Sequence, residues 1–409
     1  MNETTKAPAP VTPSKPYYAG IDIVKILAVF LVVCIHFYLY TGFYYTPINN
    51  SSFIVPIAGR WIAYTCVPIF MIATGYLMKN KTISKDYYKG LIKIIVIYVV
   101  ISIICIKFNK ERYGTEFDAW KIFKGFTEYS NANYAWYVNY YISIFLVIPF
   151  LNLAFNGLKT KKQRLVLVVT VTALTVFARS FFLGFERNEQ AKLFPDYLSG
   201  VWPFANYYAG AFIREYPMKK KVRGKLITAV IMIAALIFLT LSTYHQSMDD
   251  IENDQHVLSW HFNDYSSYPV FILALCIFIL LCDIKTENKT AKRILRTISG
   301  ATFATYLISY VFDGYFYESH PGIFGFKDVV GFNAKYPDVP ERFSHWHTEV
   351  LRHFIPSLIC GIAIHGLYDL GETLVKKAFS RKAEPSAEAV VEAAAEAEIK
   401  AETAEENKE

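Results

Sequence analysis

The chain is divided by a series of apolar segments, about ten in number, each close to the length that crosses a bilayer as a helix. Lipid cannot hydrogen-bond exposed backbone groups, so a spanning segment of this kind must be helical. The segments are residues 21–40, 54–78, 90–107, 136–157, 165–184, 197–213, 226–244, 268–283, 298–317 and 348–370. With 54% hydrophobic and only 19% charged residues among 409, the chain is too apolar for a typical soluble domain. We predict an all-α polytopic membrane protein embedded in a lipid bilayer.

The positively charged residues concentrate in alternate loops. Blocks such as KNKTISKDYYKGLIK, REYPMKKKVRGK and DIKTENKTAKRILR lie on one side of the apolar segments, whereas the loops on the other side hold few bases and many acids and aromatics. Cytoplasmic loops carry an excess of lysine and arginine, so we predict ten spans with both termini in the cytosol. The net charge of +7 is spread over these blocks rather than gathered on one face, so no nucleic-acid partner is expected.

The composition along the chain suggests three parts. Residues 1–17 are rich in proline and polar residues and are expected to form a disordered cytosolic N-terminus. Residues 18–372 hold all of the apolar segments and form the transmembrane domain. Residues 373–409 are charged and rich in alanine and glutamate without an apolar stripe, so we expect a fraying helix or a disordered cytosolic tail.

The first apolar segment carries ionisable residues at both ends. Lys25 and His36 lie eleven positions apart, which in an α-helix places both on one face and about 16 Å apart along the axis. Asp22 lies one turn before Lys25 on the same face and can pair with it. Polar groups in a span usually face a bundle interior or an aqueous cavity, which favours a functional site. The alternative is that Asp22 and Lys25 lie at the membrane interface and that His36 bonds to a neighbouring helix.

This first segment resembles that of the integral-membrane acyltransferase-3 family, whose hallmark is an arginine, ten intervening residues and a histidine. Lys25 replaces the arginine here, and His36 takes the histidine position. The second segment, CVPIFMIATGYLM, is similar to the family's VP-x-F-F-x-x-S-G-Y-L pattern and is the more specific match, with Thr74 in place of the serine. Weaker similarities follow in SKDYYKGLIK, in YAWYVNYYISIFLVIPFLN and in GATFATYLISY, where Ser309 stands at a position that is often histidine.

The resemblance implies a bacterial enzyme of the cytoplasmic membrane. Its reaction would move an acyl group, most often acetyl, from cytosolic acyl-CoA to a hydroxyl of an extracytoplasmic or lipid-linked carbohydrate, with acyl-CoA as a co-substrate and no permanently bound cofactor. Such a reaction needs a base for the hydroxyl proton, and a neutral imidazole suits this role near pH 7. We therefore assign His36 as the catalytic residue. Direct transfer and a transient acyl-imidazole both stay open.

The phosphates of acyl-CoA require cations on the cytosolic side. Lys89 and Lys93, at the entrance of the third segment, are predicted to supply them, with Lys25 and its neighbour Asp22 deeper along the path of the donor. Lysine keeps the charge of the family's arginine but not its planar, bidentate geometry. The alternative for Lys89 and Lys93 is the ordinary enrichment of bases in a cytosolic loop.

Three arginines fall inside predicted spans rather than beside them: Arg60, Arg179 and Arg352. The predicted topology places each in the outer half of its helix, near the depth of His36. We expect these arginines, with Trp136, to contact the acceptor or the oxyanion. The alternative is interhelical pairing or snorkelling.

No metal site is expected. The stretch HWHTEVLRH holds His345, His347, Glu349 and His353, but this spacing matches no standard ligand set, so contact with the acceptor is the favoured use. The six cysteines lie in or at the edges of apolar segments without a close C-x-x-C pair and are interpreted as small hydrophobic residues.

Two other functions fit the same sequence. A polytopic transporter or flippase for an envelope glycan or its precursor would also line its path with buried charges, but such proteins commonly show inverted repeats, and none is detectable here. A non-catalytic membrane scaffold or sensor is the weaker alternative. The acyl chain, the acceptor glycan and the oligomeric state leave no signal in the sequence.

Overall fold

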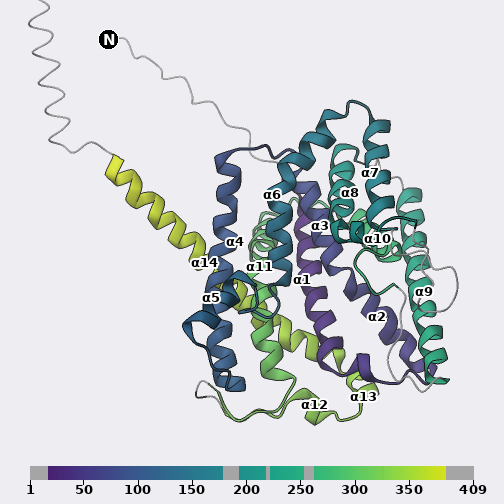
Figure 1. Cartoon of the computed structure of the whole chain (residues 1–409), viewed down its shortest axis with the longest axis vertical. Helices are drawn as coiled ribbons and strands as arrows, with labels where there is room; N and C mark the ends of the chain where they lie inside the picture. Colours follow the sequence, from purple (N-terminus) through teal and green to yellow (C-terminus); the bar gives the residue numbers. More distant parts are fainter. Residues whose placement is uncertain are drawn as a thin grey trace, which may run out of the picture. The chain divides into compact units, whose positions relative to one another are not determined.

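The computed structural model describes residues 17–177, 193–217, 222–252, 262–323, 325 and 327–383. Within these ranges the regular structure is helical, apart from one isolated antiparallel bridge between His320 and Val329. By contacts the chain divides into two units, residues 1–362 and 363–409. The helices, shown in Figure 1, are α1 (Ala19–Tyr40), η1 (Phe43–Tyr45), η2 (Ser51–Phe53), α2 (Ile54–Tyr64), α3 (Cys66–Met78), α4 (Lys85–Tyr113), α5 (Ala119–Thr127), α6 (Trp136–Gly157), α7 (Lys161–Thr175), η3 (Asp196–Val201), α8 (Pro203–Glu215), α9 (Val222–Glu252), α10 (Tyr268–Leu281), α11 (Lys289–Phe316), α12 (Phe332–Lys335), α13 (Val339–Ser344) and α14 (Trp346–Ala383).

Every predicted apolar segment overlaps a helix, which confirms the all-α membrane fold. In the part of the chain that is described, six helical stretches are long and apolar enough to cross a membrane: Ala19–Tyr40, Ser51–Met78, Lys85–Tyr113, Trp136–Gly157, Val222–Met248 and Trp346–Ala378. Three others are shorter as described, since α7 has 15 residues, α8 has 13 and α10 has 14, below the ~20 of a typical span. The count of ten spans and the cytosolic location of the termini stay predictions.

The second predicted segment is two helices rather than one. α2 ends at Tyr64, α3 begins at Cys66, and Thr65 lies between them. Pro68 accounts for the break, because it has no N–H to bond back to the Tyr64 carbonyl and its ring crowds that turn. At this break the Thr65 hydroxyl donates to the Ile62 carbonyl, in the last turn of α2, at 2.7 Å. The break places the first turn of α3 at the edge of a pocket beside α1.

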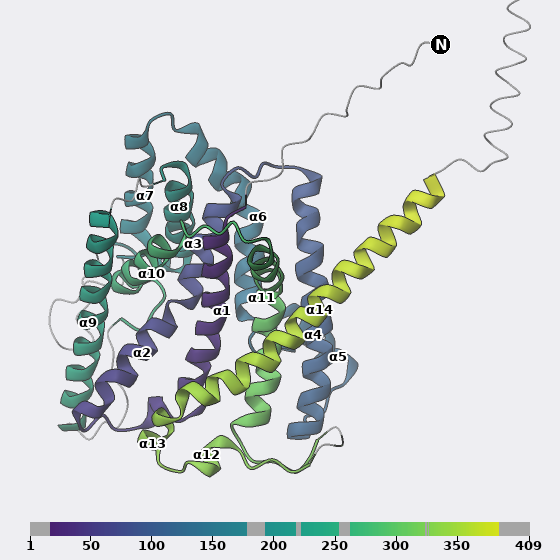
Figure 2. The same ribbon diagram turned by 180° about the vertical axis from the view of Figure 1, so that it is seen from behind.

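Contacts in the first unit fix the direction of the helices that build the site. α1 and α11 run the same way, because Lys25 bonds to Ser299 in the first half of α11 and His36 contacts Asp313 near its end. α14 runs the opposite way, because His353 near its start contacts the same Asp313 and Gly361, two turns later, packs against Thr305. Figures 1 and 2 show α1 between α11 on one side and α3 on the other.

The same reasoning extends to α3 and α8. Tyr76, near the end of α3, packs against Tyr18, just before α1, so α3 runs opposite to α1. α8 runs with α3, because Lys79 and Glu215 at their ends form an ion pair. These directions agree with the alternation that the predicted topology requires for its first, second, sixth, ninth and tenth segments.

α3 and α8 approach each other closely through two glycines. A Cβ atom added at Gly75 of α3 would overlap the backbone oxygen of Tyr207, and one added at Gly210 of α8 would overlap the backbone oxygen of Ile72. Small residues let helix backbones touch inside a membrane, where packing rather than hydrophobic burial drives association. The glycine of the ATGYL motif therefore sets the distance between these helices.

The second unit is described through Ala383 and is helical there, as the last part of α14. This helix continues past residue 370, the predicted end of the last span, and takes in the first residues of the predicted tail. The boundaries predicted at residues 18 and 372 stay predictions.

Candidate active site

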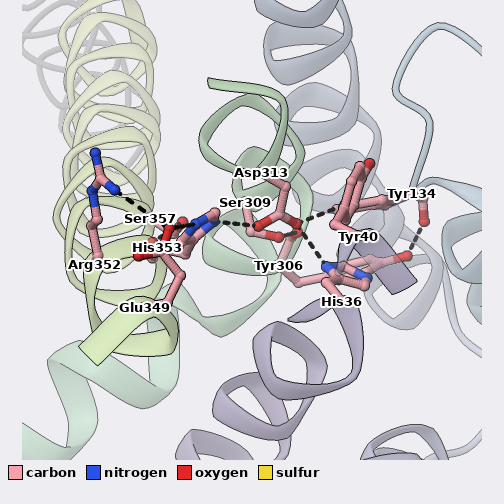
Figure 3. A network of polar contacts seen from close by, with 10 residues as sticks. All are labelled: His36, Tyr40, Tyr134, Tyr306, Ser309, Asp313, Glu349, Arg352, His353 and Ser357. Carbon is pink, nitrogen blue, oxygen red and sulfur yellow. Dashed lines mark hydrogen bonds and ion pairs between the residues drawn. The ribbon is translucent and has the colours of Figure 1, made fainter. Parts of the chain in front are cut away.

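His36 of α1 and Asp313 of α11 form the centre of a hydrogen-bonded network, shown in Figure 3. The Nδ1 atom of His36 lies 3.0 Å from Oδ2 of Asp313. The Asp313 side chain is fully buried, and the His36 side chain is 12% exposed. An ionised carboxylate only accepts hydrogen bonds, so Nδ1 of His36 donates to Asp313. In the neutral ring this leaves the lone pair on Nε2.

Tyr134, just before α6, contacts both members of this pair. Its hydroxyl donates to Oδ2 of Asp313 at 2.6 Å and lies 3.1 Å from the Tyr40 hydroxyl. Its ring packs against the His36 imidazole with centroids 3.9 Å apart. The Tyr306 hydroxyl of α11 donates to the backbone carbonyl of Tyr134 and ties this loop to the helix. The imidazole is thus held at one edge by a carboxylate and over one face by a phenol ring, which fixes its orientation.

α14 supplies a second histidine on the other side of Asp313. Nδ1 of His353 lies 2.8 Å from Oδ1 of Asp313, and its Nε2 lies 3.1 Å from Oε1 of Glu349. Glu349 is also 3.5 Å from the guanidinium of Arg352. The His353 side chain is fully buried, whereas that of Arg352 is 43% exposed. As Figure 3 shows, the network runs from His36 across α11 to α14, and Arg352 lies at the end away from His36.

His36 lines a pocket of about 310 Å³ with mostly aromatic walls. The aromatic lining residues are Tyr44, Phe70, Tyr134, Trp136, Tyr137, Tyr265 and Tyr306. Trp136 and Tyr265 stack with centroids 5.9 Å apart and planes at 17°. Small-molecule sites are commonly of this kind, largely apolar with a few polar groups that orient the ligand. The polar groups here are the His36 imidazole, the tyrosine hydroxyls and the Asn133 amide.

A larger hollow of about 750 Å³ lies at the opposite end of α1. Its charged lining residues are Lys225, Lys285, Lys292, Asp283 and Glu287, and its aromatic ones are Tyr17, Tyr18 and Tyr76. Arg214 lies over the rings of Tyr18 and Tyr76, and Arg296 lies over that of Tyr17. Cations therefore outnumber acids around a set of aromatic faces. From Ala19 at this hollow to His36, α1 rises about 26 Å.

Lys25 lies on α1 between the two cavities. Its ammonium donates to the backbone carbonyl of Ser299 on α11 at 2.7 Å. Asp22 lies in the first turn of the same helix. The unbroken α1 helix keeps Lys25 and His36 on the face that meets α11, as the spacing predicts.

Lys89 and Lys93 lie on α4. The Lys89 side chain is 66% exposed and pairs with Asp86 at 2.7 Å. Neither lysine is among the residues that line the two cavities just described. The role of these lysines in binding acyl-CoA stays a prediction.

The predicted arginines have different surroundings. Arg60 is buried, donates to Asn263 and lies 4.1 Å from the ring centroid of Tyr64. Tyr64 stacks on the pocket residue Tyr265, and Arg60 also lies 5.8 Å from the ring centroid of Tyr44, another pocket residue. Arg352 pairs with Glu349, and Arg179 lies outside the described residues. The two described arginines do not line the pocket of His36, whereas Trp136 does.

Two residues of the network, Asp313 and Tyr134, are absent from the sequence-based assignments. Asp313 lies in the run YLISYVFDGYF, and an acidic residue inside a span marks a functional candidate by default, so the sequence carried a signal for it. Tyr134 is one of 30 tyrosines and carries no such signal. His353 and Glu349 belong to the HWHTEVLRH stretch, and the structure joins them to Asp313 rather than to the pocket.

The network has the arrangement of a proton-transfer site. A neutral His36 can accept a proton on Nε2, and the Asp313 carboxylate then stabilises the imidazolium through Nδ1. Among the described residues, no group of three or more His, Cys, Asp or Glu side chains is placed to hold a metal ion. The ring nitrogens and carboxylate oxygens of the network face one another instead of a common point.

In a comparison with protein-family models, residues 18–326 match the model described as an acyltransferase domain. The match includes His36, Tyr134 and Asp313 and ends before α14. No match was found among curated proteins or among solved structures.

Proposed function

Because the chain belongs to the acyltransferase-3 family and is a multi-pass membrane acyltransferase, we propose that it moves an acyl group, specifically acetyl, from cytosolic acyl-CoA to a carbohydrate hydroxyl. The acceptor is an extracytoplasmic or lipid-linked glycan, and the membrane is the bacterial cytoplasmic membrane.

One observation carries this proposal: a buried carboxylate orients a histidine that lines an aromatic pocket. Nε2 of His36 takes the proton of the acceptor hydroxyl as its oxygen attacks the thioester carbonyl. The C–O bond forms, the C–S bond breaks, and the imidazolium returns the proton to the departing thiolate. Asp313 stabilises the imidazolium between these two events. If His36 instead attacks first, the same groups serve an acyl-imidazole.

The hollow at the start of α1 supports a donor that enters from the cytosolic end. Coenzyme A carries phosphates and a flat purine, and this hollow combines lysines with tyrosine rings. Lys25 lies between the hollow and His36, where a cation favours an anionic or polar donor over lipid. The acyl chain then reaches the imidazole along α1. Lys89 and Lys93 would attract the donor electrostatically rather than hold it.

The aromatic pocket supports a carbohydrate acceptor. Sugar rings present C–H faces that pack on aromatic side chains, and Trp136 and Tyr265 offer stacked rings beside His36. The Asn133 amide and the tyrosine hydroxyls supply hydrogen bonds to sugar hydroxyls.

Transfer of label from acetyl-CoA to acceptors in isolated membranes tests this function. The wild-type protein should label a glycan or lipid-linked glycan fraction, and His36→Ala should lower the rate by ~10²-fold or more, because general-base catalysis commonly contributes that much. His245→Ala is the matched control, since His245 is exposed on α9 and lies outside the network. Equal rates for wild type and His36→Ala would contradict the role of His36.

The same membranes separate an enzyme from a transporter. An enzyme labels its acceptor only when acyl-CoA is present, whereas a transporter moves a glycan or precursor without it. Acyl-CoA-independent flux with no labelled acceptor would overturn the proposed reaction.

A further inference from the structure

His353 has a carboxylate at each of its two ring nitrogens. Nδ1 lies 2.8 Å from Asp313 and Nε2 lies 3.1 Å from Glu349. A carboxylate offers only acceptors, so each of these contacts requires a proton on the nitrogen. A neutral imidazole carries one N–H, and an imidazolium carries two. With both carboxylates ionised, the geometry therefore requires the imidazolium form of His353.

The charges around this ring balance in that form. The titratable or charged side chains that surround it are Asp313 from α11, Tyr317 just after α11, Glu349 and Arg352 from α14 and, beyond Asp313, His36 and Tyr134. The phenols are neutral. Two carboxylates then face one imidazolium and one guanidinium, with His36 neutral. Asp313 and His353 are fully buried and Glu349 nearly so, and burying a net charge is costly, so the balanced state is favoured.

We infer that His353 stays an imidazolium, held in place by Glu349. Its charge offsets that of the Asp313 carboxylate from the side opposite His36. His36 therefore stays uncharged and able to act as the base. This inference rests on the proposed function for its catalytic consequence. His353 and Glu349 are positioning residues, because they act through Asp313 and do not line the pocket. Both lie beyond residue 326, where the family match ends.

The role of the His353 charge follows from the effect that its removal would have on His36. Without the His353 cation, Asp313 and Glu349 would leave a net negative charge beside His36. His36 would then hold a proton in the resting enzyme, because an opposite charge at hydrogen-bond distance favours the charged form of an imidazole. A protonated His36 has no lone pair on Nε2 and cannot accept the hydroxyl proton.

Nitrogen NMR of the purified full-length protein tests the charge directly. The protein is labelled with ring-¹⁵N histidine in lipid nanodiscs, and the His353 signals are assigned by their loss in His353→Gln and by their shift in Glu349→Gln. Both ring nitrogens of His353 should carry protons across the neutral and mildly alkaline range, although a free histidine loses one near pH 6.5. A singly protonated His353 at the upper end of this range would overturn the inference.

Acyl transfer tests the consequence. His353→Gln should lower the rate at neutral pH by at least ~10-fold, because His36 becomes charged. Adding Glu349→Gln restores the charge balance, so the double variant should transfer faster than His353→Gln alone. A purely structural role predicts the reverse order, and a double variant no faster than the single one would overturn the charge-balance argument.

A matched control exists on the same helix. His365 and Asp369 also form a pair one turn apart, with atoms 3.3 Å from each other, but they lie outside the network. His365→Gln should leave the transfer rate unchanged. If the wild-type protein transfers no acyl group at all, the proposed function fails, and the NMR spectrum alone still decides the charge of His353.

Discussion

At the scale of residues, the site depends on one imidazole whose two nitrogens have different surroundings. Nδ1 of His36 is bound to a buried carboxylate, and the ring faces an aromatic pocket. Its spacing from Lys25 singles out His36 in the sequence, because helical periodicity is a local property. Asp313 is 277 residues away, and its pairing with His36 depends on which helices lie side by side. Periodicity within one segment does not contain that information.

Tyr134→Phe tests how far the orientation of Asp313 matters. The change removes the hydroxyl that donates to Oδ2 of Asp313 but keeps the ring that packs on His36. Hydrogen bonds to charged groups contribute about 1.5–3 kcal/mol, so we expect transfer to slow by roughly 10- to 100-fold. The rate is measured with labelled acetyl-CoA in membranes that contain equal amounts of protein.

Tyr140→Phe provides the comparison. The Tyr140 hydroxyl also donates a hydrogen bond, to the Gly200 carbonyl at 2.7 Å, but it does not line the pocket. This variant should retain the wild-type rate. A loss that is the same in both variants would show that Tyr134 acts through the packing of the fold and not through Asp313.

At the scale of elements, helices set by the periodicity of their own sequence could be predicted, whereas interruptions between helices could not. α1 keeps its length from Ala19 to Tyr40, so the eleven-residue spacing places Lys25 and His36 on one face in the structure as in the prediction. The break at Thr65 depends on how Pro68 is accommodated, and the sequence alone is compatible with a kinked single helix. α8 and α10 are also shorter than the predicted segments, and where they end depends on the helices packed against them rather than on local sequence.

The α3–α8 contact gives a test at this scale. Gly75→Ala places a Cβ atom on the backbone oxygen of Tyr207, so the two helices must separate. Overpacking of this kind typically costs about 1–3 kcal/mol, and we expect a lower midpoint of thermal unfolding in detergent.

Gly224→Ala controls for the effect of alanine itself. Gly224 lies in α9, where an added Cβ atom has nothing within 4 Å. Alanine favours a helix over glycine, so the unfolding midpoint should stay the same or rise slightly. Equal destabilisation in both variants would contradict the close contact between α3 and α8.

At the scale of the whole molecule, the fold brings together groups that no local pattern connects. The alternation of basic loops predicts helix directions, and the contacts of α1, α3, α8, α11 and α14 agree with it. Alternation does not predict neighbours, so the meeting of α1, α11 and α14 at Asp313 comes from the three-dimensional packing. Through these contacts the first apolar segment packs against the last two.

The most direct test of the central claim is a double-mutant cycle on acyl transfer with His36→Ala, Asp313→Asn and the two combined. Asparagine keeps the shape of Asp313 but cannot stabilise an imidazolium as a carboxylate does. Residues that act as one catalytic unit are strongly non-additive. We predict that each single variant loses ~10²-fold or more and that the double variant is no slower than His36→Ala alone. Losses that multiply in the double variant, or an Asp313→Asn protein with the wild-type rate, would contradict the claim that His36 and Asp313 work as a single base.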